Sequence, residues 1–228
     1  MNLFDYLADP ANWTGETGIG YLLLQHLGYT VAAVGIAALI AIPLGIFIGH
    51  TGKGSFLVIG VSNAARAIPS LGLLVLVVLL LGTGVGPIIG VLAILAVPPI
   101  LTATAAGING ADRGAVHAAS ALGMSAGQVV RNVEWPLALP LVISGLRSAA
   151  LQVVATATIA AYSSGTGLGR LLITGNANRN YSEMFAGAFL VALLAIVLDI
   201  VLGAIAWLLA RRRGPRSKTI GSAVAVPA

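Results

Sequence analysis

The residues of this chain that could carry out chemistry are few, and they form no recognisable catalytic pattern. Cysteine is absent, which excludes thiolate metal sites and cysteine nucleophiles. The sequence holds neither a His-Glu-x-x-His zinc motif nor the Gly-x-x-x-x-Gly-Lys-[Ser/Thr] loop that binds nucleotide phosphates. Asp199 lies alone inside an apolar stretch, without the partner carboxylate that an aspartic protease needs. We therefore predict no catalytic residue, no metal and no cofactor in this chain.

Charged and polar residues inside the apolar stretches are the remaining candidates. At a rise of 1.5 Å per residue, Arg66, Arg147 and Asp199 each lie roughly 15–20 Å from the more basic end of their stretch. A charge at that depth in a bilayer costs at least ~2.5–3.5 kcal/mol. We therefore hypothesise that Asp199 pairs with Arg147 or Arg66. The alternative is a static pair that only joins helices.

Hydroxyl and amide side chains in the same stretches could line a translocation path, or could bond back to their own helix. The candidates are Ser70, Thr102, Thr104, Gln152, Thr156, Thr158, Ser163 and Ser164. Aromatic residues make up only 6% of the chain and form no cluster that could hold a quaternary ammonium group. We expect high-affinity capture of any such substrate to belong to a separate protein.

The composition places the chain in a membrane. Of its 228 residues, 58% are hydrophobic and 8% are charged, with a mean hydropathy of +0.99. A soluble domain carries roughly 25% charged residues. About 20 apolar residues form a spanning helix, so we predict an all-α membrane protein with five spans. The predicted spans are Tyr21–Gly49, Phe56–Leu81, Pro87–Ile108, Leu137–Ala161 and Met184–Leu209.

The distribution of charge predicts how these spans are oriented. With the N-terminus outside, the inner segments hold eight basic and two acidic residues, and the outer segments hold two basic and four acidic residues. Because basic residues collect on the cytoplasmic side, we predict an extracytoplasmic segment 1–20, a membrane domain 21–210 and a basic cytoplasmic tail 211–228. The net charge of +5 then reflects topology, and no nucleic-acid partner is expected. We interpret His26, His50 and His117 as interfacial or solvated.

The longest polar segment on the predicted inner side runs from residue 109 to residue 136. Ala115, Ala118, Ala119 and Leu122 have the spacing of one helix face. Gly123 is suited to end that helix and Ser125 to cap a second one. The pattern predicts a helix–turn–helix on the cytoplasmic surface, for which an ordinary amphipathic connector is the alternative interpretation.

This segment resembles the loop signature of binding-protein-dependent ABC importer permeases, which is Glu-Ala-Ala, three residues, Gly, nine residues, an aliphatic residue, two further residues and then Pro. His117 stands where that family usually has Glu. The resemblance implies a coupling helix that docks on a separate ATPase, which binds ATP and Mg. It also implies a methionine-importer-like fold, a second permease copy and an extracytoplasmic binding protein. The implied coupling residues are His117, Ala118, Ala119, Gly123, Met124, Val133, Glu134 and Pro136.

Two further segments resemble the osmoprotectant permeases of this superfamily. They are the Ile68-Pro69-Ser70-Leu71-Gly72-Leu73-Leu74 segment and the Gly165-Thr166-Gly167-Leu168-Gly169 loop. The resemblance implies a bacterial inner-membrane protein that imports glycine betaine, carnitine, choline or proline. The alternatives are the same superfamily with methionine or another amino acid as cargo, and a channel or secondary carrier that works without an ATPase.

Overall fold

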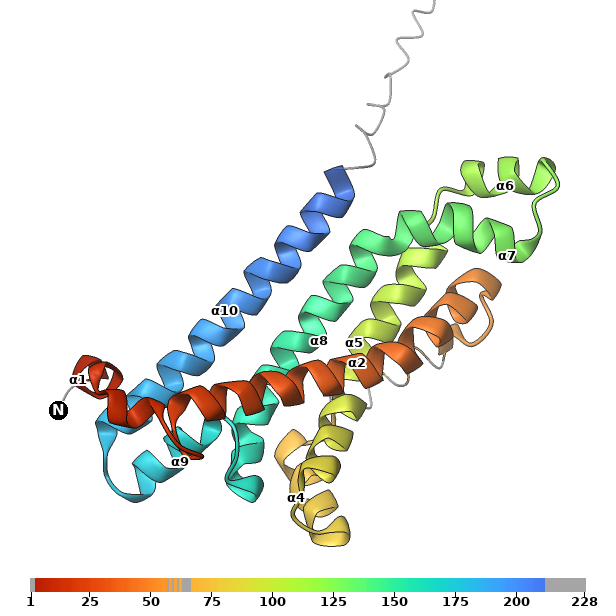
Figure 1. Ribbon diagram of the computed structural model, residues 1–228. Helices are drawn as coiled ribbons and strands as arrows, with labels where there is room; N and C mark the ends of the chain where they lie inside the picture. The colour runs from red at the N-terminus through yellow and green to blue at the C-terminus, as the bar shows by residue number, and fades with distance from the viewer. Residues whose placement is uncertain (1–2, 57, 59, 61, 63–66, 212–228) are drawn as a thin grey trace, which may run out of the picture.

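The computed structural model describes residues 3–56, 58, 60, 62 and 67–211 (Figure 1). Every regular element in this part of the chain is a helix, which confirms the all-α prediction. The elements are α1 (Leu3–Ala8), the 3-10 turn η1 (Pro10–Trp13), α2 (Ile19–Thr51), α4 (Ser70–Leu81), α5 (Val85–Asn109), α6 (Arg113–Ala121), α7 (Ala126–Val129), the π-helical turn η2 (Val130–Glu134), α8 (Trp135–Ser164), α9 (Gly169–Ala177) and α10 (Tyr181–Arg211).

Four helices in the described residues are long and apolar enough to cross a membrane. They are α2, α5, the run from α7 through α8, and α10. Each contains one of the predicted spans and extends beyond it, by a few residues in α2, α5 and α10 and by eleven residues at the start of the run from α7 through α8. The remaining predicted span, Phe56–Leu81, is represented by α4, which is shorter than a span. Part of that stretch, including Arg66, lies outside the described residues.

Helix α5 lies between α2 and α8, and its contacts with them hold the bundle together. A Cβ atom added at Gly45 of α2 would lie 2.6 Å from the Cβ of Thr104 in α5. One added at Gly145 of α8 would lie 2.5 Å from the Cβ of Ala103 in α5. Lipid provides no hydrophobic drive for helices to associate, so such close backbone packing is what holds them together. The fold therefore requires glycine at these two positions, because any side chain there would clash with α5.

The order of the contacts fixes the relative directions of the three helices. Gly45 lies against Thr104 and Gly49 lies against Ile108, so α2 and α5 run in the same direction. Gly107 lies against Ala138, whereas Gly145, later in α8, contacts Ala103, earlier in α5. Helices α5 and α8 are therefore antiparallel. As a result, the ends of α2 and α5 meet the start of α8 at one end of the bundle.

The two ends of the bundle carry different short helices. Figure 1 shows α6 and α7 projecting from the end where α5 finishes, with α1 and α9 at the opposite end. Helix α10 packs through its first half against α9 and α8, in a cluster that includes Leu171, Val154 and Leu190. Most of its second half is exposed. Helix α10 is thus attached mainly at the α9 end.

We predict that Gly145→Ala destabilises the bundle because its methyl group has no room against α5. Overpacking of this kind costs about 1–3 kcal/mol, so the apparent melting temperature of the purified protein in detergent should fall. The matched control is Gly90→Ala on α5, where an added Cβ meets no atom within 4 Å. Equal melting temperatures for the two variants would contradict the packing described above.

Candidate functional site

The segment between α5 and α8 folds as the helix–turn–helix that its sequence predicts. Asp112 caps α6 by accepting a 2.8 Å hydrogen bond from the backbone N–H of Gly114. At the other end Gly123 has φ +82°, and the N–H of Met124 bonds to the carbonyl of Ala119 at 3.2 Å. This is the left-handed glycine turn that commonly ends a helix. Ser125 then begins α7 in a capping box.

The helix–turn–helix presents a small apolar surface away from the bundle. Ala119 is buried, whereas His117 and Ala118 are exposed. Leu122, which follows α6, is 85% exposed, the largest fraction among the exposed large hydrophobic residues described. The predicted common face of small residues is therefore divided: Ala119 packs inward and Leu122 points outward. An exposed leucine beside exposed alanines is suited to contact another protein.

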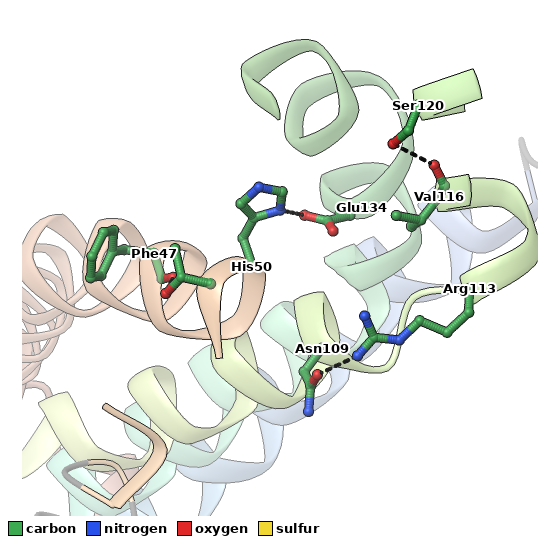
Figure 2. Close-up of polar contacts among 8 residues, drawn as sticks. Phe47, His50, Asn109, Arg113, Val116, Ser120 and Glu134 are labelled. Atoms are coloured by element: carbon green, nitrogen blue, oxygen red, sulfur yellow. Dashed lines mark hydrogen bonds and ion pairs between the residues drawn. The ribbon is translucent and has the colours of Figure 1, made fainter. Parts of the chain in front are cut away.

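The return from α7 to α8 carries a buried polar contact that sequence reasoning missed. Glu134 ends the π-helical turn and is 5% exposed. The Nδ1–H of His50, at the end of α2, donates a 2.7 Å hydrogen bond to its Oε2 atom (Figure 2). His50, interpreted from the sequence as interfacial or solvated, lies at the end of α2 with 26% of its side chain exposed. Glu134 itself faces the bundle, while Val133 and Pro136 are half-buried beside it.

A cavity of about 460 Å³ opens between α5 and α8. Its polar lining comes from Ser62, Thr102, Ser144, Ser148 and Gln152. The Ser62 and Thr102 hydroxyls are 2.7 Å apart, and Gln152 donates to the carbonyl of Leu95 at 3.1 Å. Sequence analysis did not identify Ser144 and Ser148 as candidates, although their four-residue spacing with Gln152 predicts a shared helix face.

The other predicted path residues lie away from this cavity. Thr104, Thr156 and Thr158 each donate to the carbonyl four residues earlier in their own helix, at 2.8–2.9 Å. Ser70 begins α4 and Ser163 lies near the end of α8, and neither lines the cavity. The side chain of Ser164 is outside the described part of the structure. Of the predicted set, the structure brings Thr102 and Gln152 together.

The ion pair between Arg147 and Asp199 joins two of the long helices. Arg147 of α8 donates through Nε and Nη2 to the two carboxylate oxygens of Asp199 in α10. The side chains are 44% and 29% exposed, so the pair lies on the side of the bundle. Arg66, the other predicted partner, lies outside the described residues. The structure therefore brings together the two charges that sit at similar depth in neighbouring helices.

His26 lies inside the bundle rather than at an interface or in solvent, which corrects its interpretation from the sequence. It is fully buried, and its Nε2 atom lies 3.2 Å from the carbonyl oxygen of Val154 in α8. The loop at Gly167 lies against the ring, since a Cβ atom added there would be 3.2 Å from Nδ1 of His26. The Gly167 N–H donates a 3.2 Å hydrogen bond to the side chain of the neighbouring Gln25. His117, in contrast, is exposed as expected.

Comparison with known proteins identifies the family. Residues 41–214 match the family described as the inner membrane component of binding-protein-dependent transport systems. The chain belongs to this family. The match includes α5, α8, α10 and the whole helix–turn–helix, so the chain is the permease subunit of an ABC importer and a multi-pass protein of the bacterial inner membrane.

Curated relatives of this permease match it over most of its length. It is 35% identical to a choline transport system permease protein of Bacillus subtilis (strain 168), with 80% of this chain and 84% of the relative covered. A glycine betaine/carnitine/choline permease protein of that strain is 34% identical, with coverages of 82% and 88%. An osmoprotectant import permease protein of Salmonella typhimurium (strain LT2) is 33% identical, with coverages of 92% and 95%.

Solved structures share the fold of this permease. A chain of the inward-facing MetNI methionine ABC transporter superposes with a TM-score of 0.74 at 21% identity, covering 84% of this permease and 95% of that chain. A second crystal form of the same transporter gives a TM-score of 0.73 at 22% identity. These matches establish the fold, in agreement with the methionine-importer-like fold expected from the sequence.

We predict that the Arg147–Asp199 contact stabilises the permease only as a pair. Asp199→Leu or Arg147→Leu alone leaves one charge unpaired within the membrane, and removing one member of an ion pair costs more than replacing both. Each single variant should lower the amount and the melting temperature of purified permease, and the double variant should recover most of both. If the double variant lost as much protein yield and melting temperature as the two single variants together, this prediction would be wrong.

Proposed function

We propose that this permease imports osmoprotectants of the quaternary ammonium class: choline, glycine betaine or carnitine, with proline as a further candidate. The observation that carries the proposal is the 33–35% identity, over most of both chains, to three permeases whose names state choline, glycine betaine, carnitine or osmoprotectant transport. Methionine or another amino acid is the alternative cargo. The likeness to a methionine transporter is at 21–22% identity and supports the fold alone.

The cavity between α5 and α8 is the proposed translocation path. Among the described residues, its polar lining consists of hydroxyl and amide groups. Such groups suit passage of a small polar substrate, because the lining residues that the structure describes form no aromatic cage that would hold a quaternary ammonium group tightly. Thr102 and Gln152 are the path residues that the geometry supports best. Capture from outside then requires a separate binding protein.

The topology we propose has five crossings, with the N-terminus outside and the C-terminus inside. Helices α2 and α5 run in the same direction, so the chain between Thr51 and Val85 must return across the membrane. Residues 52–81, which include α4, are the segment available for that crossing. The positive-inside rule then assigns residues 1–20 to the outside, the helix–turn–helix to the cytoplasm and the basic tail 211–228 to the cytoplasm.

In the proposed assembly two permease copies each dock one ATPase through the helix–turn–helix. The residues proposed to contact the ATPase are the exposed ones, His117, Ala118, Leu122 and Gly123, with Met124 beside them. Ala119, Val133, Glu134 and Pro136 support this surface from within. ATP-driven closure of the ATPases would draw the two helix–turn–helices together and shift the permeases between two packings. ATP and Mg bind the partner in this scheme.

The test of this function is uptake in reconstituted vesicles. Purified permease is assembled with its ATPase and binding protein, and uptake of labelled choline, glycine betaine, carnitine, proline and methionine is measured with and without ATP. We expect uptake of one or more of the quaternary ammonium compounds, only when ATP and the ATPase are present. Uptake without the ATPase would establish a channel or secondary carrier, and uptake of methionine alone would reject the proposed cargo.

We further predict that Gly123→Trp uncouples the permease. Gly123 has φ +82° and open space around it, so an indole there would strain the turn and block close docking. ATPase co-purification and ATP-driven uptake should both fall at least about tenfold, a loss of 1.4 kcal/mol or more in docking free energy. Insertion into the membrane should be retained.

The matched control is Gly15→Trp at the opposite end of the molecule. Gly15 also has φ +82° and no atom within 4 Å of an added Cβ, so the backbone strain is comparable. Co-purification of the ATPase should remain at the wild-type level in this variant. Equal loss in both variants would mean that general strain, and not docking, explains the result.

A further inference from the structure

Glu134 is the only buried acidic residue in the described part of the chain. A buried carboxylate is costly unless it is paired and hydrogen-bonded. His50 supplies that partner from α2, across 84 residues of sequence, at 2.7 Å. Figure 2 shows the imidazole and the carboxylate pointing toward one another between the end of α2 and the turn that precedes α8.

The position of Glu134 in the backbone makes this contact more than a local stabilisation. Glu134 is the last residue of η2, where the N–H of Trp135 bonds to the carbonyl of Val130, five residues earlier. A π-helical turn interrupts the regular α-helical ladder and is frequent at functional sites. Kinks in long helices commonly occur at such turns, so η2 is a place where the run from α7 into α8 can bend.

Helix α2 has no direct chain connection to the helix–turn–helix. The helix–turn–helix leaves α5 after Asn109 and enters α8 through η2, whereas α2 ends at Thr51. Helices α2 and α5 pack as a pair through Gly45 and Gly49. The His50–Glu134 hydrogen bond is therefore a further attachment, which fixes η2 to the α2–α5 pair.

We propose that His50 is a positioning residue for coupling in this permease. By holding Glu134, it keeps η2 against the end of α2, so that movement of the helix–turn–helix moves α2 and α5 with α8. Without this contact the same movement is absorbed as bending at η2. The inference rests on the proposed function, because it requires an ATPase that moves the helix–turn–helix.

The inference is tested by following ATP-driven movement at two positions. The chain has no cysteine, so single Lys53→Cys and Arg131→Cys variants each carry one environment-sensitive fluorophore, attached before assembly with the ATPase. Both positions are exposed; one follows the end of α2 and the other lies in η2. In the wild-type background we expect both labels to respond when ATP is trapped with vanadate.

In a His50→Leu or Glu134→Leu background, the response at residue 53 should fall at least about threefold while the response at residue 131 persists. The double variant should be no worse than either single one, because both remove the same contact. His50→Asn places an amide donor near the position of Nδ1 and should restore most of the response. The number of ATP molecules hydrolysed per substrate imported should rise by a similar factor in the Leu variants.

The matched control is Thr51→Val, adjacent to His50. The Thr51 hydroxyl donates to the carbonyl of Phe47 at 2.7 Å and accepts from the backbone N–H of Lys53 at 3.2 Å, so its contacts lie at the end of α2 itself. Both contacts are exposed, so water can replace them. This variant should behave as wild type. An unchanged response at residue 53 in the Leu variants, with only a lower protein yield, would make the contact purely structural and overturn the inference. No response at either label in the wild-type background would instead contradict the proposed function, and the inference with it.

Discussion

The structure depends on the close approach of α5 to the helices on either side of it. Within a bilayer, helices gain nothing from hiding apolar surface from one another, so packing of bare backbone is the main source of association. Gly45 and Gly49 allow it on the α2 side, and Gly107 and Gly145 allow it on the α8 side. The same contacts make α2 and α5 parallel and α8 antiparallel to them, which brings the ends of all three to the base of the helix–turn–helix.

This arrangement accounts for the cavity between α5 and α8 and for the position of α10 outside the set of three packed helices. Prolines 98 and 99 in α5 and the hydroxyl face of α8 leave polar space between two helices that otherwise pack tightly. Helix α10 takes no part in the cavity lining; its first half packs against α9 and α8, and its middle is held by the Arg147–Asp199 pair. A well-packed set of three helices with a loosely attached fourth is a reasonable basis for two alternative packings.

The features that could be predicted from the sequence depend either on neighbouring residues or on the position of a residue along a single helix. The Gly123 turn and the Ser125 cap follow from backbone rules that act within a few residues. A partner for Asp199 at a similar depth was predicted from the rise of 1.5 Å per residue, which left Arg147 and Arg66 as the candidates. The burial of His26 and the partner of Glu134 could not be predicted, because each depends on which helix faces it across 84 to 128 residues of sequence.

Three of the polar contacts between helices lie at different levels of the bundle, and their burial separates their roles. At the end near α9, His26 meets the backbone of α8 under complete burial, which suits a fixed junction. At mid-depth, Arg147 and Asp199 remain partly exposed, so they orient α10 without filling the core. At the end where the helix–turn–helix joins, Glu134 is buried but its partner His50 is partly exposed, and the backbone there is π-helical. Of these three, this last contact combines a polar attachment with a π-helical backbone next to the helix–turn–helix, so it is the one whose geometry a docked partner is best placed to change.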